Sequence, residues 1–242
     1  MPTGTEDSLN SVLFLDCETG GLDPTKDRLI ELGLVSWSIE HACVVKAWSA
    51  LVQGPSNEAE SANHIPPKAL ALGLPLPTVL DYARKVAAGA DVIVAHNASF
   101  DRSFLPELSR PWVCSMEDLK WTDDPKGFAS LVSLALNFGL GVSHAHRALT
   151  DCITLARLFE RLVERGVDIR AFLAHGLRPK AVFRSLAPFE DKDKVKSFGF
   201  HWAPLPGEPP DSKPTTWWKR MAVEDAGALP FRVQQDGESR VG

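Results

Sequence analysis

The sequence of 242 residues lacks any long hydrophobic run. No stretch approaches the roughly 20 apolar residues that a membrane-spanning helix requires, so a membrane protein is not indicated. The first residues, MPTGTEDSLNS, carry acids where a secretory signal peptide has a basic patch followed by an apolar run. These absences predict a soluble, cytoplasmic protein that does not associate with membranes.

Cysteine pairs of the kind that bind metals or form disulfide frameworks are also absent. The four cysteines show neither a Cys-x-x-Cys spacing nor another metal-binding pattern; they are Cys17, Cys43, Cys114 and Cys152. We interpret them as reduced thiols, most of them in the core, of a cytoplasmic protein.

An excess of basic residues is missing as well, since 26 Lys and Arg stand against 31 Asp and Glu, for a net charge of −5. This balance argues against a surface coated with basic residues for nonspecific nucleic-acid binding. It leaves a local basic groove possible, because acids clustered around metal ions also make the total charge more negative. The chain has no evident internal repeat or low-complexity tract.

The first half of the sequence reads as a strand meander followed by alternating helices and strands. A weak capping signal at Thr78 and Asp81 precedes a helical pattern of apolar residues. The remaining segment predicted to be helical is 99–108, and the predicted strands are 11–18, 28–38, 43–52 and 91–96.

Further helices are expected over 131–140 and from Arg147 to Leu162, where apolar residues repeat every three or four positions. Asp151 falls on the apolar stripe of the second helix, where a carboxylate is costly unless it is paired or bound to metal. The pattern as a whole predicts an α/β fold with a mixed sheet flanked by helices.

The composition changes after about residue 175, where we expect a small C-terminal α+β module covering 175–242. We predict a strand over 181–189, a short helix over 190–200 ended by Gly199, and a return strand at Trp217 and Trp218. The proline-rich segment 204–214 should be an exposed loop. The last residues, 234–242, are expected to be disordered.

Two acids lie at the end of the first predicted strand. Asp16 and Glu18 share one face, roughly 7 Å apart along the strand, while Cys17 points to the other face. Together with Asp101, Asp151 and His146, they form a set of four carboxylates and one imidazole. Mg²⁺ and Mn²⁺ prefer carboxylate oxygens, and two such ions held roughly 3.5–4 Å apart suit phosphodiester hydrolysis.

Three segments that carry these residues resemble the motifs of a known enzyme family. DCETGGL (16–22), AHNASFD (95–101) and HRALTD (146–151) match, in order and spacing, the DnaQ-like DEDDh 3′-to-5′ exonucleases. The resemblance covers roughly residues 11–165. It implies a ribonuclease-H-like exonuclease domain over 1–174 that shortens DNA from single-stranded or duplex 3′ ends and releases 5′-mononucleotides.

The resemblance also implies a role for each acid. Asp16, Glu18 and Asp151 would hold the metal on the nucleophile side. Asp16 would bridge to a second Mg²⁺ or Mn²⁺, whose site Asp101 completes directly or through water. His146 would take a proton from the attacking water, a task suited to an imidazole.

The same resemblance places substrate contacts after Glu18 and in two later segments. The backbone of Thr19, Gly20 and Gly21 would approach the terminal nucleotide and Leu22 would wedge against its base. Relatives often carry a second threonine where this chain has Gly20, and the segment at His64 lacks the family's glycine. The other candidate contacts are His64, Asn97 and Phe100.

Other interpretations remain open at this point. Each acid alone is typical of a strand end or a first helical turn, and only the ordered set predicts catalysis. A proofreading subunit of a DNA polymerase would have the same site, although no clear clamp-binding peptide is present. An RNA-trimming enzyme would also fit, because the metal site reads the phosphodiester and not the sugar. A catalytically silent nucleic-acid adaptor would be expected to have lost one of the five positions.

The C-terminal module has its own two interpretations. Its aromatic residues could stack on bases beside the lysines of 192–196, Lys219 and Arg220, or could form the core of a small domain. A protein partner could also bind through this module. The aromatic residues are Phe198, Phe200, Trp202, Trp217 and Trp218.

Overall fold

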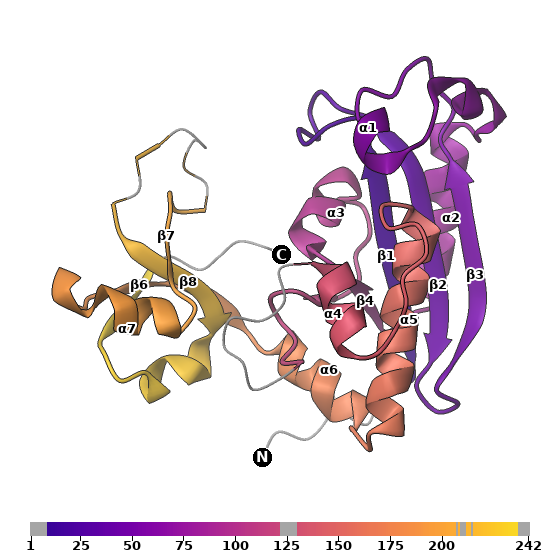
Figure 1. Cartoon of the computed structure of the whole chain (residues 1–242). Coiled ribbons are helices and arrows are strands. Elements are labelled where there is room, and N and C mark those ends of the chain that lie inside the picture. Colours follow the sequence, from indigo (N-terminus) through magenta and orange to yellow (C-terminus); the bar gives the residue numbers. More distant parts are fainter. Residues whose placement is uncertain (1–8, 122–129, 207, 209–211, 214, 237–242) are drawn as a thin grey trace. The chain divides into compact units, whose positions relative to one another are not determined.

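The computed structural model describes residues 9–121, 130–206, 208, 212–213 and 215–236. The chain divides into two compact units (Figure 1). Among the described residues, the first unit ends at Leu177, and the second contains Lys120, Trp121 and the chain from Arg178 onward. The boundary expected from the sequence lies near 175. Each unit is described separately below.

The first unit is built on a five-stranded mixed sheet in the order β3-β2-β1-β4-β5. β1 pairs antiparallel with β2 and parallel with β4, so the sheet changes direction at β1. The predicted mixed sheet and its first four strands are confirmed. The strands are β1 (Ser11–Thr19), β2 (Leu29–Ser38), β3 (Cys43–Leu51), β4 (Val92–Ala95) and β5 (Trp112–Cys114).

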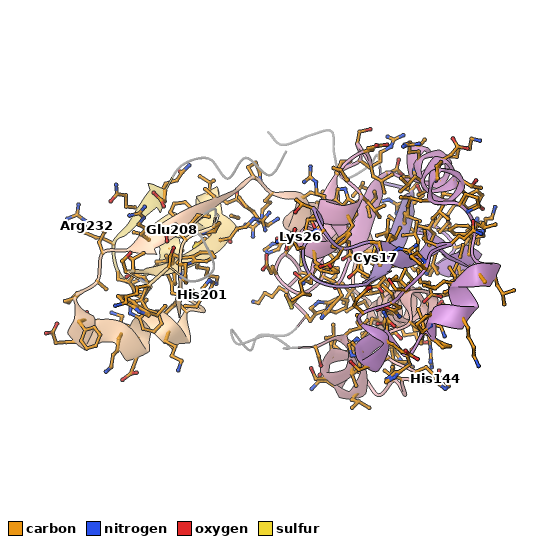
Figure 2. The ribbon with its side chains drawn as sticks, turned by 90° about the horizontal axis from the view of Figure 1, so that it is seen from above. Cys17, Lys26, His144, His201, Glu208 and Arg232 are labelled. Carbon is orange, nitrogen blue, oxygen red and sulfur yellow. The ribbon has the colours of Figure 1, made fainter. Side chains whose placement is uncertain are left out.

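Helices cover both faces of this sheet, as expected where a strand such as β4 is apolar throughout. α5 (Ala148–Glu164) lies on one face and α2 (Leu76–Ala88) on the other (Figure 1). On the α5 face, the ring of Phe14 contacts Phe159 at 4.9 Å between centroids. On the α2 face, Leu13, Leu15 and Cys17 of β1 pack in one core cluster with Val79 and Ala83. Cys17 belongs to that cluster and lies inside the unit (Figure 2).

The shorter elements differ from the sequence-based boundaries for local reasons. α2 begins at Leu76 after Pro75, so the capping signal at Thr78 was wrong. α3 ends at Phe104 rather than 108, because the residue before Pro106 is disfavoured in a helix. The other short elements are α1 (Glu60–Asn63), η1 (Pro67–Leu72), α3 (Ala98–Phe104), α4 (Leu131–Asn137) and α6 (Ile169–Leu177).

The second unit contains a four-stranded antiparallel sheet in the order β7-β8-β6-β9. Its core contains Phe183, Val195, Phe200 and Met221. The α+β character expected for the C-terminal module is confirmed. Its elements are β6 (Lys180–Ser185), η2 (Phe189–Asp191), α7 (Lys192–Ser197), β7 (His201–Trp202), β8 (Trp217–Ala222), η3 (Val223–Ala228) and β9 (Val233–Asp236).

Two boundaries in this unit were wrong. The strand expected over 181–189 ends at Ser185, and Phe189 begins a 3₁₀ turn after Pro188. The expected disorder from residue 234 does not hold for 234–236, which belong to β9 and pair with β6. The predicted helix end is confirmed, since Gly199 has a φ of 79°. Parts of the expected loop 204–214, and residues 237–242, lie outside the described residues.

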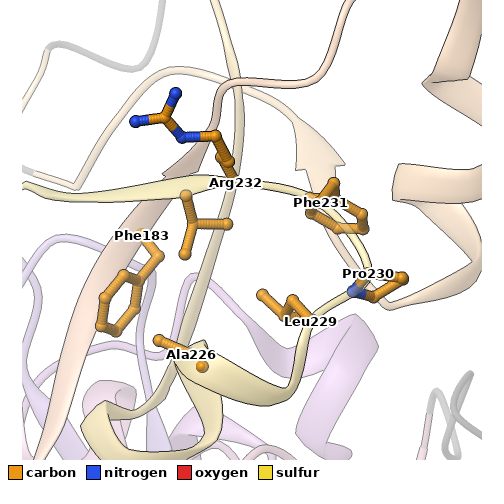
Figure 3. A pocket seen from close by; sticks show the side chains of 8 residues that line it. Phe183, Ala226, Leu229, Pro230, Phe231 and Arg232 are labelled. Carbon is orange, nitrogen blue, oxygen red and sulfur yellow. The ribbon is translucent and has the colours of Figure 1, made fainter.

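The second unit has an open pocket of about 580 Å³. Apolar side chains such as Phe183, Leu229 and Phe231 line it, with Arg232 beside them (Figure 3). All of its lining residues belong to this unit. Within the described ranges, no helix is long and apolar enough to cross a bilayer.

Candidate active site

Three carboxylates from two distant parts of the chain, the end of β1 and the first turn of α5, meet in the first unit. Asp16, Glu18 and Asp151 each offer an oxygen, and these oxygens lie within 4.8 Å of one another. All three side chains are partly buried. Carboxylate oxygens at this spacing are a donor set that suits a hard divalent cation. The structure therefore brings together three of the four acids that the motifs single out.

Strand geometry explains why two of these acids share a face. Side chains alternate along β1, so Asp16 and Glu18 lie on the face of Phe14, which packs against α5. Asp151 lies in the first turn of α5 and reaches the same face. The expectation that Cys17 points away is confirmed by its place in the core on the α2 side.

Burial and mutual repulsion disfavour the ionised form of these acids when no cation is bound. Burial raises the pKa of Asp16 well above its usual value, and the charges of Asp101, Asp151 and Glu18 raise it further. Burial also raises the pKa of Glu18 to about 7, with Asp151 and Glu31 adding to the rise and Arg147 opposing it. A divalent cation bound between these carboxylates would offset both effects.

Asp101 takes a different position from the other three acids. It is 1% exposed, and one carboxylate oxygen accepts a hydrogen bond of 2.9 Å from the backbone N–H of Cys17. It lies close enough to raise the pKa of Asp16, yet it is not part of the group of three whose oxygens converge. Burial raises the pKa of Asp101 itself.

His146 lies in the loop that leads into α5. Its backbone N–H donates to a carboxylate oxygen of Asp151 at 3.2 Å, and its φ is 63°. The residue is exposed, so its imidazole is open to solvent beside the acids. The loop thus ties the histidine to Asp151 through the backbone.

Sequence reasoning missed two charged residues at this site. Glu31 on β2 is 3% exposed and accepts two hydrogen bonds from the Arg147 guanidinium, at 3.0 and 3.1 Å. The signal that could have found Glu31 is an acid inside the apolar strand LIELGL. Arg147 follows His146 directly within HRALTD.

The loop after Glu18 is held by internal hydrogen bonds. Thr19 is buried and its hydroxyl donates to the carbonyl of Gly21 at 2.6 Å. The N–H of Gly20 donates to the carbonyl of Arg28 at 2.9 Å. A Cβ added at Gly20 would lie 3.1 Å from a carboxylate oxygen of Glu58, so Glu58 occupies part of the space next to this glycine.

The other candidate substrate contacts differ in their exposure. Leu22 is 84% exposed, and His64 and Asn97 are exposed in left-handed backbone conformations. The segment of His64 is joined to the loop because the Asn63 amide donates to the carbonyl of Thr19 at 3.3 Å. Phe100 is half-buried and contacts the ring of Phe104 at 5.2 Å.

In the second unit, the aromatic residues divide between core and surface. Phe200 is buried in the core, and Trp217 packs against it in part. Trp202 is 45% exposed and Phe198 38% exposed. The indole N–H of Trp218 donates to the carbonyls of Ala203 and Pro204.

Comparison with known proteins places the first unit in one family. The RNase T exonuclease family matches residues 13–159. The DNA polymerase III subunit epsilon of Treponema pallidum is 32% identical over 167 residues, which are 61% of this chain and 74% of that protein. The PolC-type DNA polymerase III of Thermotoga petrophila is 33% identical over 172 residues, but this chain spans only 12% of its length.

A solved structure agrees with these matches. Exonuclease X in complex with 5′ overhanging duplex DNA is 28% identical, with a TM-score of 0.55, over 68% of this chain and 99% of that one. The family match covers more than half of the chain and includes Asp16, Glu18, Asp101, His146 and Asp151. The protein therefore belongs to this exonuclease family, the DnaQ-like 3′-5′ exonucleases, whose members use divalent metal ions.

Proposed function

We propose that this protein hydrolyses phosphodiester bonds of DNA from the 3′ end and releases 5′-mononucleotides. The observation that carries the proposal is the convergence of Asp16, Glu18 and Asp151, whose oxygens lie within 4.8 Å. Acids brought this close at a partly buried edge are stable together only with protons or with cations between them. The family membership of the unit that holds them supports the same reading.

In this proposal, the acids hold the metal ions and the loops hold the DNA end. Asp16, Glu18 and Asp151 would hold the metal ions through their carboxylate oxygens, and Asp101 would complete the set directly or through water. Two Mg²⁺ or Mn²⁺ ions bound there would lower the pKa of water and stabilise negative charge on the phosphate. The imidazole of His146 accepts the proton that the attacking water loses.

The residues after Glu18 and those near His64 form the proposed pocket for the terminal nucleotide. The internal hydrogen bonds of Thr19 and Gly20 would fix the backbone of this pocket, and the exposed side chain of Leu22 would contact the terminal base. Asn97 and Phe100 complete it from α3. These residues would contact the sugar, the phosphate and the apolar face of the base. Every strand with a free 3′ end presents these groups, so the pocket would accept any such strand.

The test is a degradation assay with 5′-labelled substrates. The purified 242-residue protein and its Asp16→Ala variant are incubated with single-stranded DNA, duplex DNA or RNA, in Mg²⁺, Mn²⁺ or EDTA. We expect a ladder that shortens from the 3′ end of DNA, absent in EDTA and in the variant. Cleavage that persists in EDTA, or an inert wild-type protein, would overturn the proposal. Faster degradation of RNA than of DNA would show that the substrate is RNA and not DNA.

A further inference from the structure

A partly buried ion pair joins strand β2 to the start of helix α5. The carboxylate of Glu31 accepts from the Nε and Nη2 atoms of Arg147 at 3.0 and 3.1 Å. It also accepts from the backbone N–H of Ala148, the first residue of α5, at 3.2 Å. One carboxylate thus satisfies a guanidinium in a two-point geometry and one of the free N–H groups at the helix start.

Gly33 allows the helix to approach the strand this closely. A Cβ built at Gly33 would lie 2.4 Å from the backbone carbon of Ala148, a distance no real side chain could keep. Glu31 and Gly33 are two residues apart on one strand, so they share the face that meets α5. We call the contact formed by Glu31, Gly33, Arg147 and Ala148 the α5 joint.

The α5 joint lies beside the acids because of the pairing of β1 with β2. Asp16 is opposite Gly33, and Glu18 is opposite Glu31. Directly opposite residues in an antiparallel pair have side chains roughly 4.5–5.5 Å apart. Asp151 is one turn into α5 after Ala148, so a small shift of the helix start would move its carboxylate away from Asp16 and Glu18.

The charges of the joint make such a shift costly. The Glu31 side chain is 4% exposed and that of Arg147 is 41% exposed. A buried carboxylate that loses its cation must be protonated or resolvated, so Glu31 and Arg147 hold each other in place. Arg147 also faces Glu18, and its charge opposes the rise in the pKa of that acid.

We propose that Glu31 and Arg147 are positioning residues, which fix the first turn of α5 so that Asp151 stays within metal-binding reach of Asp16 and Glu18. This inference rests on the proposed function, since it assigns the pair a task in the same metal site. Neither side chain needs to touch the substrate. The pair acts through Asp151, and through the loop of His146 that precedes it.

The alternative is that the pair only stabilises the fold, and the two roles differ in what they change. A purely stabilising pair affects the melting temperature and leaves metal affinity and kcat of the folded protein unaltered. A positioning pair changes the metal affinity itself. Groups that orient metal ligands typically alter affinity or activity by roughly 10–100-fold when replaced.

The experiment compares Glu31→Gln and Arg147→Lys with wild type and with a matched control, Glu107→Gln. Glu107 forms an exposed Arg–Glu ion pair with Arg84, away from the acids. Mn²⁺ affinity is measured from the paramagnetic resonance signal of the free ion, kcat and KM on 3′-ended single-stranded DNA, and folding by thermal melting. Arg147→Lys retains the charge but not the two-point hydrogen bonding. If Glu31→Gln does not fold, Arg147→Lys alone tests the proposal.

We expect Mn²⁺ affinity and kcat of both variants to fall about 10-fold or more, with KM for DNA nearly unchanged and the control like wild type. Folded variants with wild-type Mn²⁺ affinity and kcat would overturn the positioning role while leaving the proposed nuclease intact. A wild-type protein that binds no Mn²⁺ and cleaves no DNA would instead remove the proposed function. A wild-type protein that binds Mn²⁺ but does not cleave still tests the joint through affinity.

Discussion

Among single residues, Asp16 is the acid most affected by its neighbours, and its replacement should have opposite effects on stability and activity. Because burial and four nearby carboxylates disfavour its charge, Asp16→Asn should raise the melting temperature of metal-free protein by about 2–4 °C. It should lower kcat by at least about 100-fold and abolish stabilisation by Mn²⁺.

Thermal melting with and without Mn²⁺ checks this prediction. Asp81→Asn is the control, since Asp81 is exposed and pairs with Lys85 on α2. Its melting temperature should stay close to that of wild type, and the effect of Mn²⁺ should be retained. A destabilised Asp16→Asn protein would mean that the carboxylate is satisfied by protein contacts alone.

His146 and His144 offer a test of the proposed proton acceptor. Both are exposed histidines of one loop, and both have a φ of 63°. His146→Ala should lower kcat by about 10²–10⁴-fold, the usual contribution of a general base, while Mn²⁺ affinity stays near that of wild type. His144→Ala should leave both quantities unchanged, and equal losses in the two variants would contradict the assignment.

The raised pKa of Glu18 predicts how the stability of metal-free protein depends on pH. A carboxyl whose pKa is about 7 when folded, against an ordinary value of 4.5, binds its proton more tightly in the folded state. Its stabilising effect is therefore complete below the ordinary pKa and is lost as the pH rises through about 7. The free energy of unfolding in urea should fall between about pH 5 and pH 8.

Two comparisons check the origin of that fall. Saturating Mn²⁺ competes with the protons and should reduce it, and Glu18→Gln should reduce it in metal-free protein. Glu107→Gln should leave it unchanged, because Glu107 lies in an exposed ion pair. A wild-type protein whose stability rises over this range would show that the acids do not repel one another as described.

At the scale of whole elements, α5 packs against β2 so closely that only glycine fits at position 33. Gly33→Ala should destabilise the protein by about 1–3 kcal/mol, the usual cost of overpacking, because the new methyl group meets the backbone of Ala148. Urea unfolding measures the change. Gly141→Ala is the matched control, since nothing lies within 4 Å of its Cβ position, and it should stay within about 0.5 kcal/mol of wild type.

Elements with a clear hydrophobic period were the ones that sequence alone could predict. The strand around Asp16 and the helix around Asp151 are long and regular, so the shared face of Asp16 and Glu18 followed from spacing. That Asp151 joins them at one site was implied by the resemblance to the exonuclease family. β5 has three residues and α1 has four, too few for a period to show. The start of α2 was missed because Pro75 and the residues after it set the boundary, not the side chain of Thr78.

The pairing of Glu31 with Arg147 could not be predicted for a different reason. Spacing along one strand or helix says which face a residue takes, but this ion pair joins residues 116 positions apart. It depends on the register of β1 against β2 and on where α5 begins. The same holds for the aromatic residues of the second unit, where neighbours such as Phe200 and Trp202 differ greatly in exposure.

For the whole molecule, two separate cores imply two unfolding events. Leu13 and its neighbours form a core in the first unit, and Phe183 and Met221 belong to a core in the second. Calorimetry of the full chain should resolve two transitions, of which Mn²⁺ raises only the one that belongs to the acidic site. Met221→Ala should lower the other, and a single transition that shifts as a whole under either change would contradict this view.

The alternation of side chains along β1 also limits how this chain can change in length. Asp16 and Glu18 lie on one face and Cys17 on the other, in a strand that is paired on both sides. Inserting or deleting one residue upstream would rotate the strand by half a turn and present a single thiol where two carboxylates belong. A thiol favours softer metals such as zinc over magnesium. Length variation before the first motif should therefore be confined to the segment ahead of Ser11, or should come in steps of two.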